Sequence, residues 1–126
     1  MAGGIVRMFD IFKKKNKENK KTTFINNAGG MIITKSLLEG TSKLKWMFRE
    51  NSANEVDNGW RAIGNTDTQE YINDSENMAV VDFNTFANIE PAILTIYNLP
   101  VGTDLEFRIE NSKRYFVDTQ SGKVIE

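Results

Sequence analysis

The apolar residues of this chain fall into short segments bounded by turn-forming residues. None approaches the roughly 18 consecutive apolar residues of a membrane-spanning helix. Strands are expected at 31–34, 44–49, 59–63 and 78–83, and a hairpin around Asn111-Ser112 is expected to join 105–109 to 115–117. Short helices are expected at 36–39, 67–72 (with Thr66 or Asp67 as the cap) and 91–97, with a turn at 85–89. The pattern predicts one α+β domain, with a mixed or antiparallel sheet of about five strands and two or three short helices.

The expected strand at 44–49 has a period of two, typical of a strand with one face in water. Its apolar and charged positions alternate, with Leu44, Trp46 and Phe48 set against Lys43, Lys45, Met47 and Arg49. In the next strand, Trp60 and Arg61 are residue types common in protein interfaces, but burial of the Trp60 ring in the core is the favoured interpretation. Because strands alternate faces, Arg61 would then face outward, beside Arg49 on the neighbouring strand.

The chain contains no histidine and no cysteine. A Ser-His-Asp triad, a Cys-His pair and an ordinary zinc site are therefore excluded, as is a disulfide framework. Catalysis by carboxylates, lysine or tyrosine remains open. We expect a non-enzymatic cytoplasmic protein with no catalytic residues, metal or cofactor, since a chain without cysteine fits a reducing compartment.

Charge is distributed unevenly along the chain. Residues 1–23 hold seven basic and two acidic residues, whereas the remainder holds nine basic and fifteen acidic residues. We expect a basic, mobile tail over 1–23, with a short amphipathic stretch, preceding a single domain over 24–126. Two readings of residues 5–21 stay open: weak contact with a membrane surface or partner, and a solvated terminus. Translation could begin at Met1 or Met8.

Nucleic acid is a disfavoured partner, because the tail lacks interleaved aromatic residues and the acidic body would repel phosphate. The polar segment from Asn65 to Glu76 has oxygen-bearing residues at several spacings of a calcium loop. It has Glu70 where the sharp turn of that loop requires glycine, which disfavours a calcium site. The carboxylate pairs in this segment could serve acid–base chemistry or simply solvation.

Several short motifs occur in an order similar to that found in a known protein family. They are Met47-Phe48-Arg49-Glu50, Gly59-Trp60-Arg61, an acidic segment with Tyr71 and Asn77, Asp82-Phe83-Asn84-Thr85, Asn88, Pro91, Pro100-Val101-Gly102 and Phe107. The chain resembles, over roughly residues 30–110, a family of small prokaryotic proteins grouped with predicted polymorphic-toxin immunity proteins. It departs from that family at Ala62-Ile63, where an aromatic residue is usual, and at Gly64-Asn65-Thr66-Asp67, where a Gly-Asp-Glu run is usual.

The resemblance implies an antitoxin-like protein that binds a cognate toxin, with an uncharacterised adaptor as the alternative. The contact face is expected in the 51–58 loop and the 65–77 segment. The candidate partner-binding residues are Arg49, Asp57, Arg61, Asp67, Glu70, Tyr71, Asp74 and Glu76. The candidate structural residues are Gly59, Trp60, Asp82, Asn84, Pro91 and Gly102. Replacing Asp67, Glu70 and Tyr71 together is expected to abolish binding without changing thermal stability.

Overall fold

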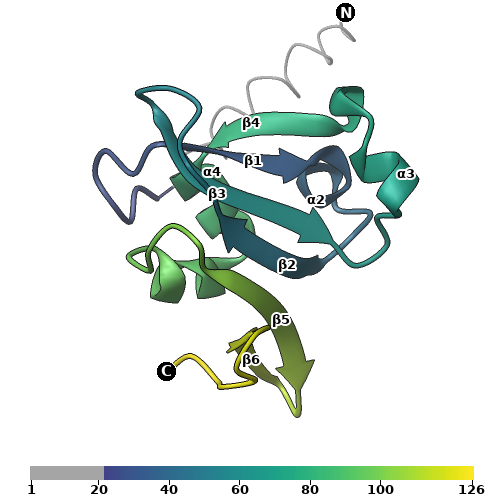
Figure 1. Ribbon diagram of the computed structural model, residues 1–126, viewed down its shortest axis with the longest axis vertical. Helices are drawn as coiled ribbons and strands as arrows, with labels where there is room; N and C mark the ends of the chain where they lie inside the picture. Colours follow the sequence, from purple (N-terminus) through teal and green to yellow (C-terminus); the bar gives the residue numbers. More distant parts are fainter. Residues whose placement is uncertain (1–21) are drawn as a thin grey trace, which may run out of the picture.

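The computed structural model describes residues 22–126, which form a six-stranded sheet with short helices (Figure 1). The strands are β1 (Gly30–Thr34), β2 (Leu44–Arg49), β3 (Asp57–Gly64), β4 (Met78–Asp82), β5 (Asp104–Glu110) and β6 (Lys113–Asp118). Their order across the sheet is β4-β1-β3-β2-β5-β6, with β1 and β3 parallel and every other neighbouring pair antiparallel. The predicted α+β class and mixed sheet are confirmed. The sheet has six strands instead of about five, because both strands of the C-terminal hairpin continue it.

The helical segments are all short. They are α2 (Lys35–Glu39), α3 (Gln69–Ile72), the 3-10 helix η1 (Ser75–Asn77), α4 (Phe83–Ile89) and the 3-10 helix η2 (Pro91–Ile96). The cap of α3 is Thr68, whose hydroxyl accepts a hydrogen bond from the Tyr71 amide at 3.1 Å, and the expected caps Thr66 and Asp67 were wrong. The expected turn at 85–89 is the body of α4, which begins earlier because Asp82 caps it. Within residues 22–126, no helix has the length and apolar character needed to cross a membrane.

The core lies on one face of the sheet. Ile33, Ala62, Met47 and Leu105 stand side by side on β1, β3, β2 and β5, and all four are fully buried. Helices α4 and η2 cover this face (Figure 1), and they contribute Phe83, Phe86, Ile93 and Ile96 to the same cluster. Within residues 22–126, the sheet therefore has a covered face, which holds the core, and an opposite face that α4 and η2 do not cover.

A β-bulge reverses the expected faces of β2. The register between β2 and β3 shifts between Leu44 and Trp46, so Leu44 and Met47 both point into the core. Trp46 is 39% exposed and lies on the opposite face. The prediction that Trp46 shares a face with Leu44 was wrong, because the extra residue of a bulge inverts the alternation beyond it.

The predicted basic tail lies outside the described residues, apart from Thr22 and Thr23. The described part of this segment is attached to α4. Asn84 accepts hydrogen bonds from the amides of Phe24 and Ile25 and donates to the Ile25 carbonyl, while Asn88 exchanges two hydrogen bonds with the backbone of Thr22. The predicted tail and both start sites stay predictions.

Candidate functional site

Two rows of side chains cross the uncovered face of the sheet. The strand pairings place Val80, Ile32, Arg61, Phe48 and Asp104 in one row. They place Ile63, Trp46, Glu106 and Val117 in the next row. Both rows mix apolar and charged side chains.

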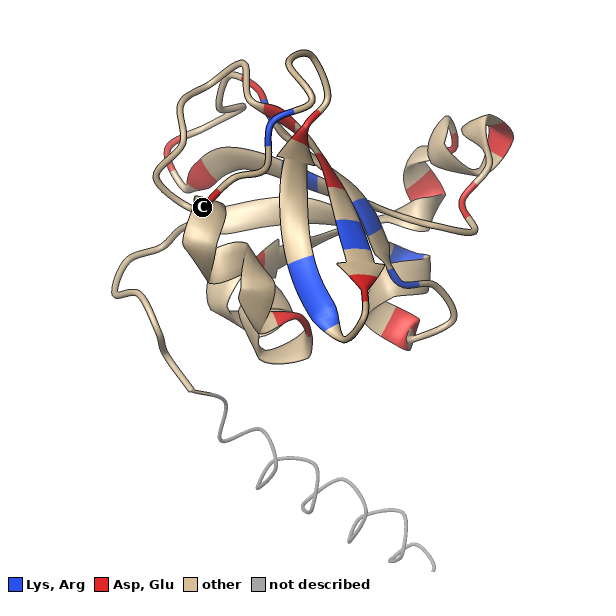
Figure 2. Ribbon diagram, turned by 90° about the horizontal axis from the view of Figure 1, so that it is seen from below, with Lys and Arg blue, Asp and Glu red and all other residues tan. Residues whose placement is uncertain are grey.

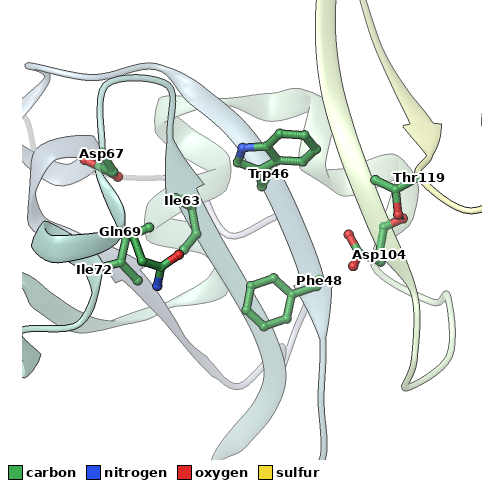
Figure 3. A pocket seen from close by; sticks show the side chains of 8 residues that line it. All are labelled: Trp46, Phe48, Ile63, Asp67, Gln69, Ile72, Asp104 and Thr119. Atoms are coloured by element: carbon green, nitrogen blue, oxygen red, sulfur yellow. The ribbon is translucent and has the colours of Figure 1, made fainter.

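A groove runs along the uncovered face where these rows meet α3 (Figure 3). It has a volume of about 480 Å³ and is lined by Trp46, Phe48, Ile63, Asp67, Gln69, Ile72, Asp104 and Thr119. The two aromatic rings come from β2, and Asp104 faces them from β5 (Figure 3). We refer to this feature as the aromatic groove.

Beside the groove, the guanidinium group of Arg61 is bonded to the carboxylates of Asp57 and Glu50. Its terminal nitrogens donate to both oxygens of Asp57 at 2.9 Å each, and its Nε donates to Glu50 at 2.7 Å. The hydrogen bond from Arg61 holds the pKa of Asp57 well below its usual range, assisted by the amides of Ala53 and Gly59. Arg61 is only 5% exposed. The prediction that Arg61 points to the face opposite Trp60 is confirmed, but the side chain is buried there because the two carboxylates close over its guanidinium group.

Arg49 lies on the other face of the sheet. It pairs with Trp60 in register, and its guanidinium group stacks 5.5 Å from the centre of the Trp60 ring. It also donates hydrogen bonds to the carbonyls of Asn58 at 2.9 Å and Leu99 at 2.7 Å. Arg49 and Arg61 are therefore not side by side, because they belong to opposite faces. The predicted burial of Trp60 is confirmed, since its ring is fully buried and its indole nitrogen donates to the Tyr97 carbonyl.

In the acidic segment 65–77, one carboxylate is held by hydrogen bonds within the domain and three others are exposed to solvent. Asp67 is half-buried and accepts hydrogen bonds at 2.6 Å from both the Ser36 hydroxyl and the Gly64 amide, so it joins α2 to the end of β3. Glu70, Asp74 and Glu76 are exposed, and Tyr71 is half-buried. Of the predicted partner-binding residues, these three carboxylates extend furthest into solvent.

The predicted structural residues lie in β3, in the turn before β5 and at the starts of α4 and η2. Gly59 has φ +89°, and a Cβ atom there would overlap the carbonyl oxygen of Glu50. Asp82 caps α4 by accepting a hydrogen bond from the Asn84 amide at 2.8 Å, and Pro91 occupies the start of η2. Gly102 also has a positive φ, +102°, in the turn before β5.

Sequence reasoning did not find the aromatic groove. Trp46 and Phe48 were expected to share a face with Leu44, and Asp104 received no role. The bulge that turns both rings outward has no marker in the residues around it. Asp104 reaches the rings only because β5 pairs with β2. Within the described part of the chain, no three acidic side chains cluster in a way that could hold a metal ion.

Comparison with protein families identifies the domain. The family model described as "Immunity protein Imm33 domain" matches residues 31–118. The chain belongs to this family. The match runs from the second residue of β1 to the last residue of β6, so the Imm33 domain includes the sheet apart from Gly30 and the lining of the groove apart from Thr119. The predicted resemblance to immunity proteins is thereby confirmed, and the match continues past the expected end at residue 110 to residue 118. No curated protein and no solved structure is significantly similar to this chain.

Proposed function

We propose that this Imm33 protein is a non-enzymatic immunity protein that neutralises a cognate toxin by direct binding. The observation that carries the proposal is the aromatic groove on the uncovered face of the sheet. Side chains such as Trp46 supply most of the binding energy in many protein interfaces, because a rigid ring buries a large area at a small cost in conformational entropy. Membership of an immunity-protein family indicates the kind of partner.

The charge around the groove supports a basic partner. The chain has no lysine or arginine between Arg61 and Arg108. This region includes α3 and η1, whose acidic residues appear in red on the short helices at the right of Figure 2. Glu70, Asp74 and Glu76 are exposed there, at the end of the groove where Gln69 and Ile72 contribute to its lining. Carboxylates at the edge of an interface accelerate association with a basic surface more than they strengthen the final complex.

The predicted partner-binding residues then take two different roles. Glu70, Asp74 and Glu76, with Tyr71, form the acidic edge of the contact surface. The other four residues are held by hydrogen bonds within the domain, so they keep the contact surface in a fixed position. They are Arg49, Asp57, Arg61 and Asp67. A preformed, rigid surface lowers the entropic cost of binding, which suits a tight inhibitor. We propose that binding takes place in the cytoplasm of the cell that makes both proteins.

Co-expression with toxin genes encoded beside this protein tests the proposal. The wild type is expected to restore growth and to co-purify with one toxin in a stoichiometric complex. Trp46→Ala is expected to lose both properties, whereas Glu39→Gln, which changes an exposed carboxylate on α2 that does not line the groove, is expected to retain them. Failure of the wild type to bind or neutralise any of these toxins would contradict the proposed function.

A further inference from the structure

From the side chains of the aromatic groove we infer that it binds an arginine side chain of the partner protein. This inference rests on the proposed function and specifies which chemical group of a toxin the groove recognises. Two features carry it: aromatic rings that line the groove, and a carboxylate beside them that forms no ion pair within residues 22–126.

The aromatic rings provide a flat surface for a planar cation. Trp46 is 39% exposed, and Phe48 lies two residues along the same strand with its ring toward the groove (Figure 3). A guanidinium group stacks well on such rings, because it is planar and weakly hydrated. The same domain already contains two cation–ring contacts: Arg49 stacks on Trp60 on the other face, and the ammonium group of Lys45 lies 5.5 Å from the centre of the Trp46 ring. An arginine of the partner would therefore share the Trp46 ring with Lys45 or displace it.

Asp104 provides the negative charge. It is adjacent to Phe48 across the β2–β5 pairing, and its side chain is exposed. Asp104 forms no ion pair with any lysine or arginine of residues 22–126, whereas Glu106, two residues further along β5, is bound by Lys45 at 2.6 Å and Arg108 at 3.0 Å. The carboxylate of Asp67, on the other side of the groove, is already engaged by Ser36 and Gly64. Asp104 is thus the groove carboxylate available to a second molecule.

Arginine fits this arrangement better than lysine does. A guanidinium group can stack on Trp46 and donate two parallel hydrogen bonds to Asp104, and both contacts use its planar shape. An ammonium group is compact and strongly hydrated, so it gains less from an open aromatic surface. Phosphate-bearing partners are disfavoured, because Asp67 and Asp104 both line the groove.

The indole N–H signals of the two tryptophans allow a direct test by NMR. The full chain, labelled with ¹⁵N, is titrated with the capped tripeptide acetyl-Gly-Arg-Gly-amide. Matched peptides carry lysine or citrulline, citrulline being the neutral counterpart of arginine. The indole signal of Trp46 is expected to shift with the arginine peptide, less with lysine and not with citrulline. The indole signal of Trp60 is expected to stay fixed, because that group is buried and bonded to Tyr97.

Matched variants locate the effect. Asp104→Asn and Trp46→Leu are each expected to weaken binding of the arginine peptide about two- to fivefold, a range typical of exposed cation–π contacts and ion pairs. Binding to Trp46→Leu is followed through the backbone amide signals of β2 and β5. Glu39→Gln removes one exposed negative charge elsewhere and is expected to leave binding unchanged. An unshifted Trp60 signal shows that each variant is folded.

Two results would overturn the inference: equal binding of the arginine and citrulline peptides, or no shift of Trp46 with any peptide. Neither result bears on toxin neutralisation, because the titration contains no toxin. Conversely, if the Asp104→Asn and Trp46→Leu variants still restore growth, the arginine site is contradicted and the immunity function is not.

Discussion

Arg61 and Asp57 form a two-pronged ion pair, in which each terminal nitrogen of the guanidinium group lies 2.9 Å from one carboxylate oxygen. Both residues belong to β3, on either side of Gly59 with its positive φ, and the carboxylate of Asp57 also accepts hydrogen bonds from the amides of Ala53 and Gly59. It therefore fixes the 51–56 loop to the sheet, next to the aromatic groove. A buried, fully bonded pair of this kind holds a loop rigidly, although its own net contribution to stability is small.

Removing one member of this pair is expected to be costly. Asp57→Ala leaves the guanidinium group of Arg61 buried with only Glu50 to balance it, which should lower the free energy of unfolding by about 3 kcal/mol. Glu50→Gln is the matched control, because the side chain of Glu50 is 56% exposed, and its loss should cost about 1 kcal/mol or less. Urea unfolding followed by fluorescence measures both values. Equal effects of the two variants would show that burial does not distinguish these carboxylates.

The same carboxylate is expected to make stability depend on pH. The pKa of Asp57 is lower in the folded state than in the unfolded chain, where an aspartate titrates near pH 4. Its contribution is therefore complete above about pH 5 and declines as the pH falls below about 4, since only the unfolded state then binds the proton. Urea midpoints at pH 7, 4 and 3 should fall more steeply for the wild type than for Asp57→Asn. Parallel curves would assign the acid sensitivity to other groups.

Gly59 and Gly102 allow backbone strain to be separated from steric overlap. Both have positive φ, but a Cβ atom at Gly59 would meet the Glu50 carbonyl oxygen, whereas at Gly102 nothing lies within 4 Å. Gly102→Ala should destabilise the domain by about 1 kcal/mol through backbone strain alone. Gly59→Ala should cost about 3 kcal/mol or more, because β2 and β3 must also move apart. Thermal unfolding of both variants checks the order, and a larger loss for Gly102→Ala would contradict it.

Asp67 and Glu70 are expected to differ in what they do, although both belong to the acidic segment. Asp67→Ala removes two hydrogen bonds to a carboxylate, from Ser36 and Gly64, and should lower the free energy of unfolding by about 2 kcal/mol. Glu70→Ala changes an exposed side chain and should alter it by about 0.5 kcal/mol or less. Replacing Asp67, Glu70 and Tyr71 together is therefore no longer expected to leave thermal stability unchanged. Chemical unfolding of the single variants decides between the two expectations.

Much of the local structure could be predicted from the sequence. Gly40 ends α2 with φ +83°, and Asn111 and Ser112, both with positive φ, form the turn of the C-terminal hairpin. These features depend on residues next to each other in the chain, so local propensity is sufficient to indicate them. The family resemblance was also available, because it depends on the order of short motifs and not on their contacts.

The sequence by itself determined the class of the fold, the burial of Trp60 and the absence of histidine and cysteine chemistry. Only the tertiary structure decided which side chains are exposed on the surface of the sheet. A bulge in β2 turned Trp46 outward, the pairing of β5 with β2 brought Asp104 beside Phe48, and two carboxylates enclosed Arg61. The first two of these outcomes depend on a one-residue shift in register and on a contact between residues distant in the chain. Hydrophobic periodicity records neither, because it averages over neighbours along the sequence.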